Sequence, residues 1–310
     1  MSLPVSVRRP TDGNLSVRLG SVFLKNPVIA ASGTFGYGVE FAHLVDLNRL
    51  GGIVVKGLSM SPMEGAPAPR LCETASGMMN AVGLQNIGVK AFVADKLPEL
   101  RRYETAIVAN VFGQTAGEYA EVLRVLEDAE GVAAYELNIS CPNTDRGGAE
   151  FGAEPGVAAQ VVSAARKAAR RPLWVKLSPN TNIMEIAKAV ESAGADAVTV
   201  ANTYPAMSLD PLSGRSRLGR LSGGLSGPAI RPLSLKLVYD VCRTVKLPVI
   251  GCGGVECCLD AIEYLAVGAS AVQVGTAHFS NPRASLEVVE GLKNIHKELK
   301  SFIMNKIDKT

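Results

Sequence analysis

The stretch LWVKLSPNTNIMEIAKAVESAGADAVTV, residues 173–200, decides the fold class of this chain. It begins and ends with short apolar runs, 173–177 and 197–200, which have strand length and are rich in β-branched residues. Between them, residues 183–193 carry apolar side chains at helical spacing. Nearly continuous apolar strands are typical of a parallel sheet that is covered on both faces. The stretch therefore predicts a strand, a covering helix and a second strand parallel to the first.

The same unit recurs along the whole chain. Further apolar runs of strand length occur at 27–31, 52–55, 106–109, 135–139, 248–250 and 271–274. Further amphipathic stretches occur at 119–129, 157–169 and 259–267. Eight strands with helices between them are the content of a (β/α)8 TIM barrel, so we predict a single barrel domain over residues 1–310. A doubly wound open sheet is the alternative, which the lack of G-x-G-x-x-G after the first strand disfavours.

Two segments are too long for simple barrel connections. Residues 58–86 follow the second strand and hold three of the 17 prolines, and residues 204–227, rich in Gly, Ser and Arg, follow the sixth. Loops of this length are usually functional lids or disordered. Both follow the carboxyl ends of strands, where barrels place their sites. We therefore expect both insertions to lie over the mouth of the barrel.

Composition excludes several classes of protein. The chain has 310 residues, a net charge of +3, 47% hydrophobic and 20% charged residues, which excludes a disordered chain. Basic and acidic residues are interspersed, which gives no case for nucleic acid. No run of 18 apolar residues could span a membrane, and no apolar segment after Arg8 and Arg9 resembles a secretory signal. Six scattered cysteines without a C-x-x-C pair favour reduced thiols and a cytoplasmic protein.

Two lysines end predicted strands. Lys56 follows the run 52–55, and Lys176 lies within 173–177. A charged group at the end of a buried strand is costly unless it is paired, and each lysine alone could pair with a neighbouring carboxylate. Two of them in one barrel favour an anionic ligand, and a desolvated lysine can stabilise negative charge that develops on a bound ring.

Glycine clusters follow the last two strands. Gly251-Cys252-Gly253-Gly254 follows the seventh strand, and Gly275-Thr276 closes the eighth. Such glycines can simply turn a strand into a helix. Their backbone N–H groups can also cradle a phosphate, and barrels often bind phosphate after strands seven and eight. The pair of clusters favours phosphate.

Asparagines mark other strand ends. Asn110, Asn138 and Asn202 lie at or just after the carboxyl ends of predicted strands, although asparagine is poor in strands. Each could be a turn former on its own. Together they favour a shared polar ligand, since an amide suits rings with alternating C=O and N–H edges, such as pyrimidines and flavins.

Cys141 is the candidate reactive thiol. It follows the fourth strand and precedes Pro142 and a Gly-rich polar loop, although a single cysteine is usually a small apolar filler. None of the three histidines is near it in sequence, and they show no metal-ligand spacing. His278 is expected to be structural.

Five motifs together resemble the class 1 dihydroorotate dehydrogenases, over about residues 15–291. The first two motifs are most similar to subclass 1B, the NAD-linked type. The motifs are ASGTFGYG (31–38), NAVGLQN (80–86), NISCPN (138–143), GLSGP (224–228) and VGTA (274–277).

This resemblance implies an FMN-containing barrel that oxidises dihydroorotate to orotate in pyrimidine synthesis. By motif, Cys141 would be the catalytic base, Lys56 would pair with the substrate carboxylate, and Lys176 would stabilise charge on the reduced flavin. The residues expected to contact the flavin are Ser32, Lys56, Gly57, Asn110, Asn138, Lys176, Ala201, Gly227, Gly253, Gly254, Gly275 and Thr276. Those expected to contact the substrate are Lys56, Asn80, Gly83, Leu84, Asn138, Asn202 and Thr203.

The resemblance also implies partners. Class 1B enzymes form a homodimeric core that works with a second subunit carrying FAD and a 2Fe-2S cluster, in a heterotetramer. This chain departs from the family at Cys252, where Met is common, at Ala201, where a larger apolar residue is usual, and at Gly57, where Ser is commoner. Its Lys-rich tail, residues 293–309, also departs from the family end.

Two other functions remain open at this point. The motif ELNISCP (136–142) is also similar to the flavin domain of dihydropyrimidine dehydrogenase, which reduces uracil or thymine. A barrel without enzymatic activity is the other alternative, and it would bind no flavin. The sequence does not identify the physiological electron acceptor, and fumarate stays possible beside NAD⁺.

Overall fold

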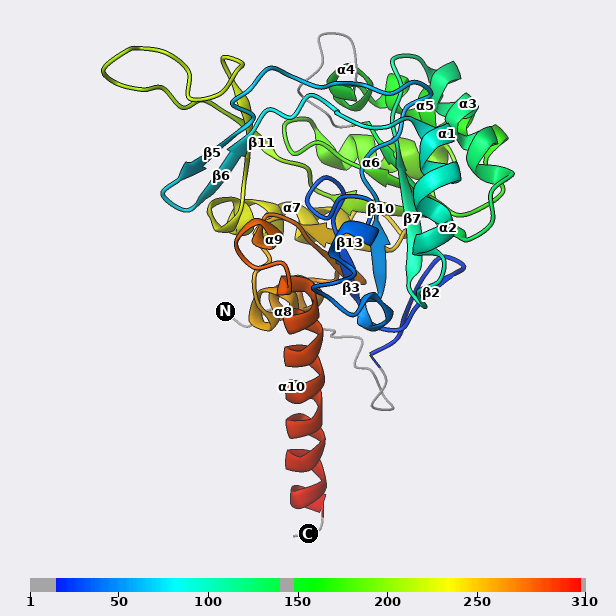
Figure 1. Cartoon of the computed structure of the whole chain (residues 1–310). Helices are drawn as coiled ribbons and strands as arrows, with labels where there is room; N and C mark the ends of the chain where they lie inside the picture. The colour runs from blue at the N-terminus through cyan, green and yellow to red at the C-terminus, as the bar shows by residue number, and fades with distance from the viewer. Residues whose placement is uncertain (1–14, 140–147, 308–310) are drawn as a thin grey trace.

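The structure is a computed structural model that describes residues 15–139 and 148–307 (Figure 1). Its centre is a closed barrel of eight parallel strands, which confirms the predicted (β/α)8 fold and excludes the open sheet. The strands are β3 (Val28–Ala30), β4 (Gly52–Val54), β7 (Ala106–Val111), β8 (Val132–Asn138), β9 (Leu173–Lys176), β10 (Ala197–Val200), β13 (Val249–Cys252) and β14 (Ala271–Val274).

Helices between the strands cover the outside of the barrel. The longer ones are α3 (Ala116–Glu127), α5 (Pro155–Ala168), α6 (Ile183–Ser192), α7 (Arg231–Cys242), α8 (Cys258–Ala266) and α10 (Ala284–Ile307). Short helical turns are α1 (Val89–Ala91), η3 (Phe92–Lys96), α2 (Leu97–Leu100), α4 (Gly148–Ala153), α9 (Ala277–Ser280), η1 (Val39–Phe41), η2 (Leu47–Arg49) and η4 (Pro228–Ile230). The last helix, α10, extends well away from the barrel (Figure 1). In the part of the chain that the structure describes, no helix has the length and apolarity needed to cross a membrane.

The amino end of the barrel is closed by a hairpin that the sequence did not predict. Strands β1 (Val17–Leu19) and β2 (Val22–Leu24) pair antiparallel around Gly20, whose φ of 63° suits the tight turn. Leu19 and Leu24 are fully buried against the lowest layer of side chains inside the barrel. The hairpin thus keeps water from the amino end of the core.

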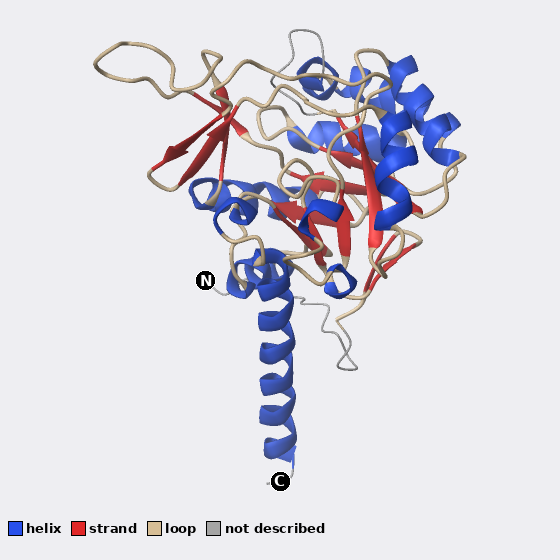
Figure 2. Ribbon diagram, viewed as in Figure 1, coloured by secondary structure: helices blue, strands red, loops and turns tan. Residues whose placement is uncertain are grey.

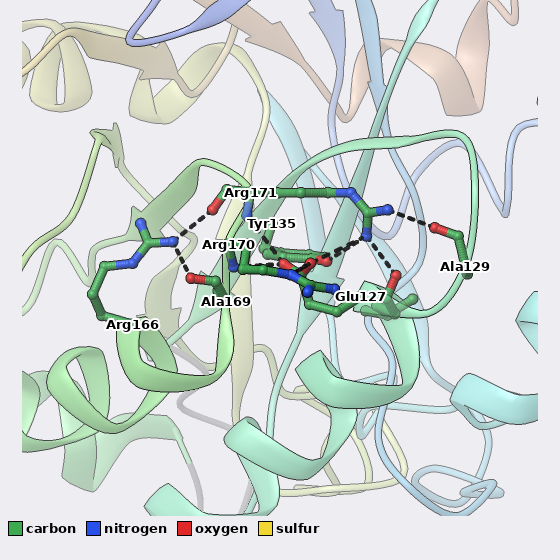
Figure 3. Close-up of polar contacts among 8 residues, drawn as sticks. Glu127, Ala129, Tyr135, Arg166, Ala169, Arg170 and Arg171 are labelled. Carbon is green, nitrogen blue, oxygen red and sulfur yellow. Dashed lines mark hydrogen bonds and ion pairs between the residues drawn. The ribbon is translucent and has the colours of Figure 1, made fainter.

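Arginines tie the loops together at this same end (Figure 3). The guanidinium of Arg171 donates to the backbone oxygens of Leu126, at 2.6 Å, and Ala129, at 2.7 Å, just where α3 ends. It also donates to the Tyr135 hydroxyl, at 2.8 Å. These bonds satisfy carbonyl groups that a helix end leaves without partners. They fasten α3 to the start of β9.

Glu127 lies in the middle of this arginine cluster. Burial acts to raise the pKa of its carboxyl group, but hydrogen bonds from the backbone N–H groups of Arg171 and Arg170 outweigh it, so the pKa is lowered. Arg166 joins the cluster by donating to the backbone oxygens of Ala169 and Arg171. The charged groups here are therefore paired within the protein.

The two insertions form one sheet rather than two loops (Figure 2). The first supplies β5 (Leu71–Thr74) and β6 (Gly77–Asn80), and the second supplies β11 (Tyr204–Ala206) and β12 (Gly223–Ser226). All neighbours are antiparallel, in the order β11-β12-β6-β5. The expectation that the insertions follow the second and sixth barrel strands is confirmed, but their strand content was not predicted.

Candidate functional site

Every second side chain of a barrel strand points inward, and these side chains form two layers inside the barrel. The lower layer is apolar and consists of Ile29, Val54, Val108, Ala134, Trp174, Ala197, Ile250 and Ala271. Side chains two residues apart on a strand point the same way. The next inward positions are Ala31, Lys56, Asn110, Glu136, Lys176, Thr199, Cys252 and Gln273. We call this second set the polar layer, and it lies toward the carboxyl ends of the strands.

Above the polar layer lies a cavity of about 1150 Å³, part of it open to solvent. Its lining includes every described residue that the sequence analysis expected to bind flavin or substrate. These are Ser32, Lys56, Gly57, Asn80, Gly83, Leu84, Asn110, Asn138, Lys176, Ala201, Asn202, Thr203, Gly227, Gly253, Gly254, Gly275 and Thr276. The structure thus brings these residues together, while their individual roles stay predictions. Cys141 lies outside the described residues.

Lys176 supplies a buried positive charge on the cavity floor. Its side chain ends 3.3 Å from Oε1 of Gln273, and the residue is only 6% exposed. Burial acts to lower its pKa, but electrostatic interactions with Cys252 and Glu136 outweigh it, so the pKa is raised. The ammonium group therefore stays charged, as binding of an anion or of a ring that becomes negative requires.

Glycines shape one side of the cavity. Gly253 and Gly254, directly after β13, have φ values of 135° and 67°, which side chains rarely adopt. A Cβ atom at Gly254 would lie 2.8 Å from the backbone oxygen of Gly227 and 2.7 Å from Cβ of Arg231, the first residue of α7. Glycine is therefore required at Gly254, and Gly253 and Gly254 both line the cavity near a helix N-terminus, an arrangement that suits a phosphate.

The first insertion contributes a turn of fixed conformation to the other side of the cavity. Asn80 donates from Nδ2 to the backbone oxygen of Gly224, at 3.2 Å, which joins the two insertions at the cavity. Leu84 has a φ of 60°, which is rare for a large side chain and marks a conformation held by its surroundings. Asn86 is not part of the lining; it holds this turn, accepting from the N–H of Gly88 at 2.8 Å and donating to the oxygen of Leu84 at 3.0 Å.

His278 has a structural place behind the cavity, as expected. It is 3% exposed, and its Nε2 lies 2.8 Å from the hydroxyl of Ser285, while Nδ1 lies 3.4 Å from that of Thr34. Burial lowers the pKa of His278 to about 4. The ring is therefore neutral near pH 7, and it connects the start of α10 to a loop that lines the cavity.

Three residues of the polar layer were not predicted from the sequence. Glu136, Thr199 and Gln273 are completely buried and hydrogen bonded to one another. Each lies within a run that was assigned only as an apolar strand. A polar residue two positions after an inward apolar residue, repeated on several strands, is the signal that could have identified them.

The chain is similar in sequence to a family of known proteins. A family model described as "Dihydroorotate dehydrogenase" matches residues 14–296. A protein of Solibacter usitatus, provisionally named dihydroorotate dehydrogenase A (fumarate), is 55% identical over 279 residues, which are 90% of this chain and 92% of the relative. The dihydroorotate dehydrogenase B (NAD(+)) catalytic subunit of Trichlorobacter lovleyi is 53% identical over 280 residues, with the same coverage.

A solved structure has the same fold. It is the crystal structure of DHODH in complex with ferulenol from Eimeria tenella, with a TM-score of 0.78 over 96% of this chain and 88% of that one. Sequence identity to it is 23%, so this similarity bears on the barrel and not on the chemistry.

Proposed function

This chain belongs to the dihydroorotate dehydrogenase family, within class 1B, and from that membership we propose that it is an FMN-dependent catalytic subunit that oxidises dihydroorotate to orotate. One observation carries the proposal. Residues from strands and insertions across the whole chain, chosen from sequence motifs, line a single cavity at the carboxyl end of the barrel.

The residues that line the cavity fit both the phosphate and the ring of FMN. Backbone at Gly227, Gly253 and Gly254 would hold the phosphate, because no side chain obstructs it there and α7 begins beside it. Lys176 would lie at the ring, with amides such as Asn110 at its polar edge. When bound, the flavin would supply a hydride acceptor.

The substrate would lie between the flavin and the turn of the first insertion. Dihydroorotate must lose a hydride from C6 and a proton from C5. Lys56 would pair with its carboxylate, and Asn80, Asn138, Asn202 and Thr203 would orient its ring through hydrogen bonds. Cys141 would take the C5 proton as general base. An unperturbed thiol has a pKa of about 8.5, so this role requires activity to rise with pH.

The electrons would leave through a partner subunit. We propose a homodimeric core with a second subunit that carries FAD and a 2Fe-2S cluster and passes electrons to NAD⁺, in the cytoplasm. Fumarate is a second candidate acceptor, because a relative with 55% identity carries that name.

The direct test is the reaction of the purified protein under anaerobic conditions. We expect a yellow protein whose flavin absorbance is bleached by dihydroorotate and perturbed by orotate but not by uracil. Perturbation by uracil alone would favour a dihydropyrimidine dehydrogenase-like enzyme, and a colourless protein that takes up no FMN would favour a barrel without this activity.

The partner and the electron acceptor need separate experiments. Copurification from the native source shows whether an iron–sulfur flavoprotein accompanies the protein, and assays with NAD⁺ and with fumarate separate the two acceptors.

A further inference from the structure

Glu136 is the centre of a hydrogen-bond network inside the barrel. Its carboxylate is completely buried and accepts three side-chain hydrogen bonds. Oε1 accepts from Nδ2 of Asn110 at 2.8 Å, and Oε2 accepts from Oγ1 of Thr199 at 2.8 Å and from Nε2 of Gln273 at 2.6 Å. The donors come from β7, β10 and β14, so one carboxylate connects four strands when its own, β8, is included.

A carboxylate can only accept hydrogen bonds, and this fixes the orientation of both amides. Asn110 and Gln273 must each turn their NH2 group toward Glu136, which points their oxygens away from it. The oxygen of Gln273 then meets Nζ of Lys176 at 3.3 Å. Asn110 lines the cavity, so its outward oxygen is an acceptor at the place where the flavin ring is proposed to bind.

The same carboxylate acts on the charge of Lys176. The groups that face this lysine are Glu136 on β8, Cys252 on β13 and Gln273 on β14, with Thr199 opposite it in the register of β10. Lys56 is the other cation of the polar layer. Burial alone would lower the pKa of Lys176, and electrostatic interactions with Cys252 and with Glu136 oppose this. Without the negative charge of Glu136, a buried ammonium group would lose its proton more readily.

We propose that Glu136 is a positioning residue that orients Asn110 and Gln273 and sustains the positive charge of Lys176 in the cavity that would hold the flavin. Glu136 does not line the cavity and acts through these neighbours. The inference rests on the proposed function, because it assigns the polar layer to the flavin.

The test is the affinity of the apo-protein for FMN between pH 7 and pH 9, measured by quenching of flavin fluorescence. In the wild type we expect a constant dissociation constant over this range. Glu136→Gln keeps the size of the side chain but presents one NH2 group to the NH2 group of either Asn110 or Gln273, so one amide must flip. We expect binding about tenfold weaker at pH 7, the effect of about one hydrogen bond, and weaker still toward pH 9.

Two further variants separate the orientation of the amides from the effect of the negative charge of Glu136 on Lys176. Thr199→Val removes one donor from the carboxylate but keeps its charge and its link to Lys176, and it should keep the flat pH profile. Gln273→Met removes the amide that joins Glu136 to Lys176 but keeps the negative charge of Glu136. It should weaken FMN binding at pH 7 and keep the flat pH profile, so it tests the positioning role even if Glu136→Gln does not fold.

Several outcomes would overturn the inference. One is a Glu136→Gln protein with wild-type affinity and a flat profile; another is a Gln273→Met protein with wild-type affinity. A third is a wild-type protein that loses affinity between pH 7 and 9 in a step that Lys176→Arg abolishes. A wild type that binds no FMN at any pH would instead refute the proposed function, and this inference with it.

Discussion

At the amino end of the barrel, Arg171 directs its guanidinium to the backbone oxygens of Leu126 and Ala129 and to Tyr135, all within the protein. At the carboxyl end, Lys176 is more deeply buried but lies on the floor of a cavity. Both positive charges are held by hydrogen bonds, but Lys176 also lines the cavity, whereas the hydrogen bonds of Arg171 are directed to oxygens of the protein. We therefore expect charged residues at the amino end to stabilise the fold and those at the carboxyl end to bind ligands, which is the general division in TIM barrels. Substitutions at the two ends should therefore have separable effects.

The largest expected effect is on the base at the carboxyl end. Cys141→Ser should lower kcat/KM by about 10²–10⁴, the usual contribution of general base catalysis. In the wild type, kcat/KM should rise with pH toward the ordinary thiol pKa of about 8.5. Steady-state kinetics from pH 6 to 10 check this. An identical pH profile in the serine variant would remove Cys141 from the base role.

Lys176 tests charge stabilisation at the same end. Lys176→Met should slow reduction of bound flavin by dihydroorotate about 10²–10³-fold, or prevent flavin binding, because a preorganised charge is lost. Stopped-flow absorbance measures the rate, and flavin content is read from the spectrum. Lys188→Met, on the exposed face of α6, is the matched control and should change neither. Normal flavin content with a normal reduction rate would refute this role of Lys176.

Arg171→Ala tests the amino end. It removes three hydrogen bonds from a charged donor, two of them to backbone oxygens at the end of α3, and the 3.9 Å ion pair with Glu127. Because the oxygens lose a charged donor, we expect a loss of about 3–5 kcal/mol in the free energy of unfolding. Urea denaturation measures this loss, and FMN affinity of the folded protein should be unchanged.

Arg170→Ala is the control for that variant. The side chain of Arg170 is 79% exposed, so its ion pair with Glu127 should contribute less than about 1 kcal/mol. Equal destabilisation by the two variants would mean that the buried hydrogen bonds of Arg171 do not provide the stability assigned to the cluster.

His278, behind the cavity, should make the free energy of unfolding depend on pH, and this effect is expected to be smaller. Burial lowers its pKa to about 4 in the folded protein, so the unfolded chain binds the extra proton between pH 6.5 and 4. Its contribution is therefore complete above pH 6.5 and is lost as the pH falls toward 4, by about 3 kcal/mol in total. His278→Gln should flatten this part of the stability curve, measured by urea unfolding at several pH values. A variant curve parallel to that of the wild type would contradict the assignment.

The barrel itself could be predicted from the sequence because each strand carries its own local signal. Runs such as 173–177 and 197–200 are apolar, β-branched and followed by helical periodicity, so no long-range information was needed. The motifs at strand ends also identified the cavity lining, since a barrel brings all carboxyl ends to one mouth.

The remaining features depend on contacts between distant residues. Strands β5 and β12, with the sequences LCET and GGLS, have little β propensity and form through pairing within a sheet of two insertions. Glu136 was hidden in an apolar run, and only the hydrogen bonds from three other strands explain a buried carboxylate there.

The shared sheet also bears on how the chain folds and how it can be altered. Strand β6 pairs with β12, so Asn80 lies opposite Gly224, far along the chain. During synthesis, the hairpin of the first insertion must wait for the second before its inner edge is covered. For the same reason, a chimera that exchanges only one insertion with a relative would leave a mismatched strand edge beside the cavity. The two segments should be transplanted as a pair.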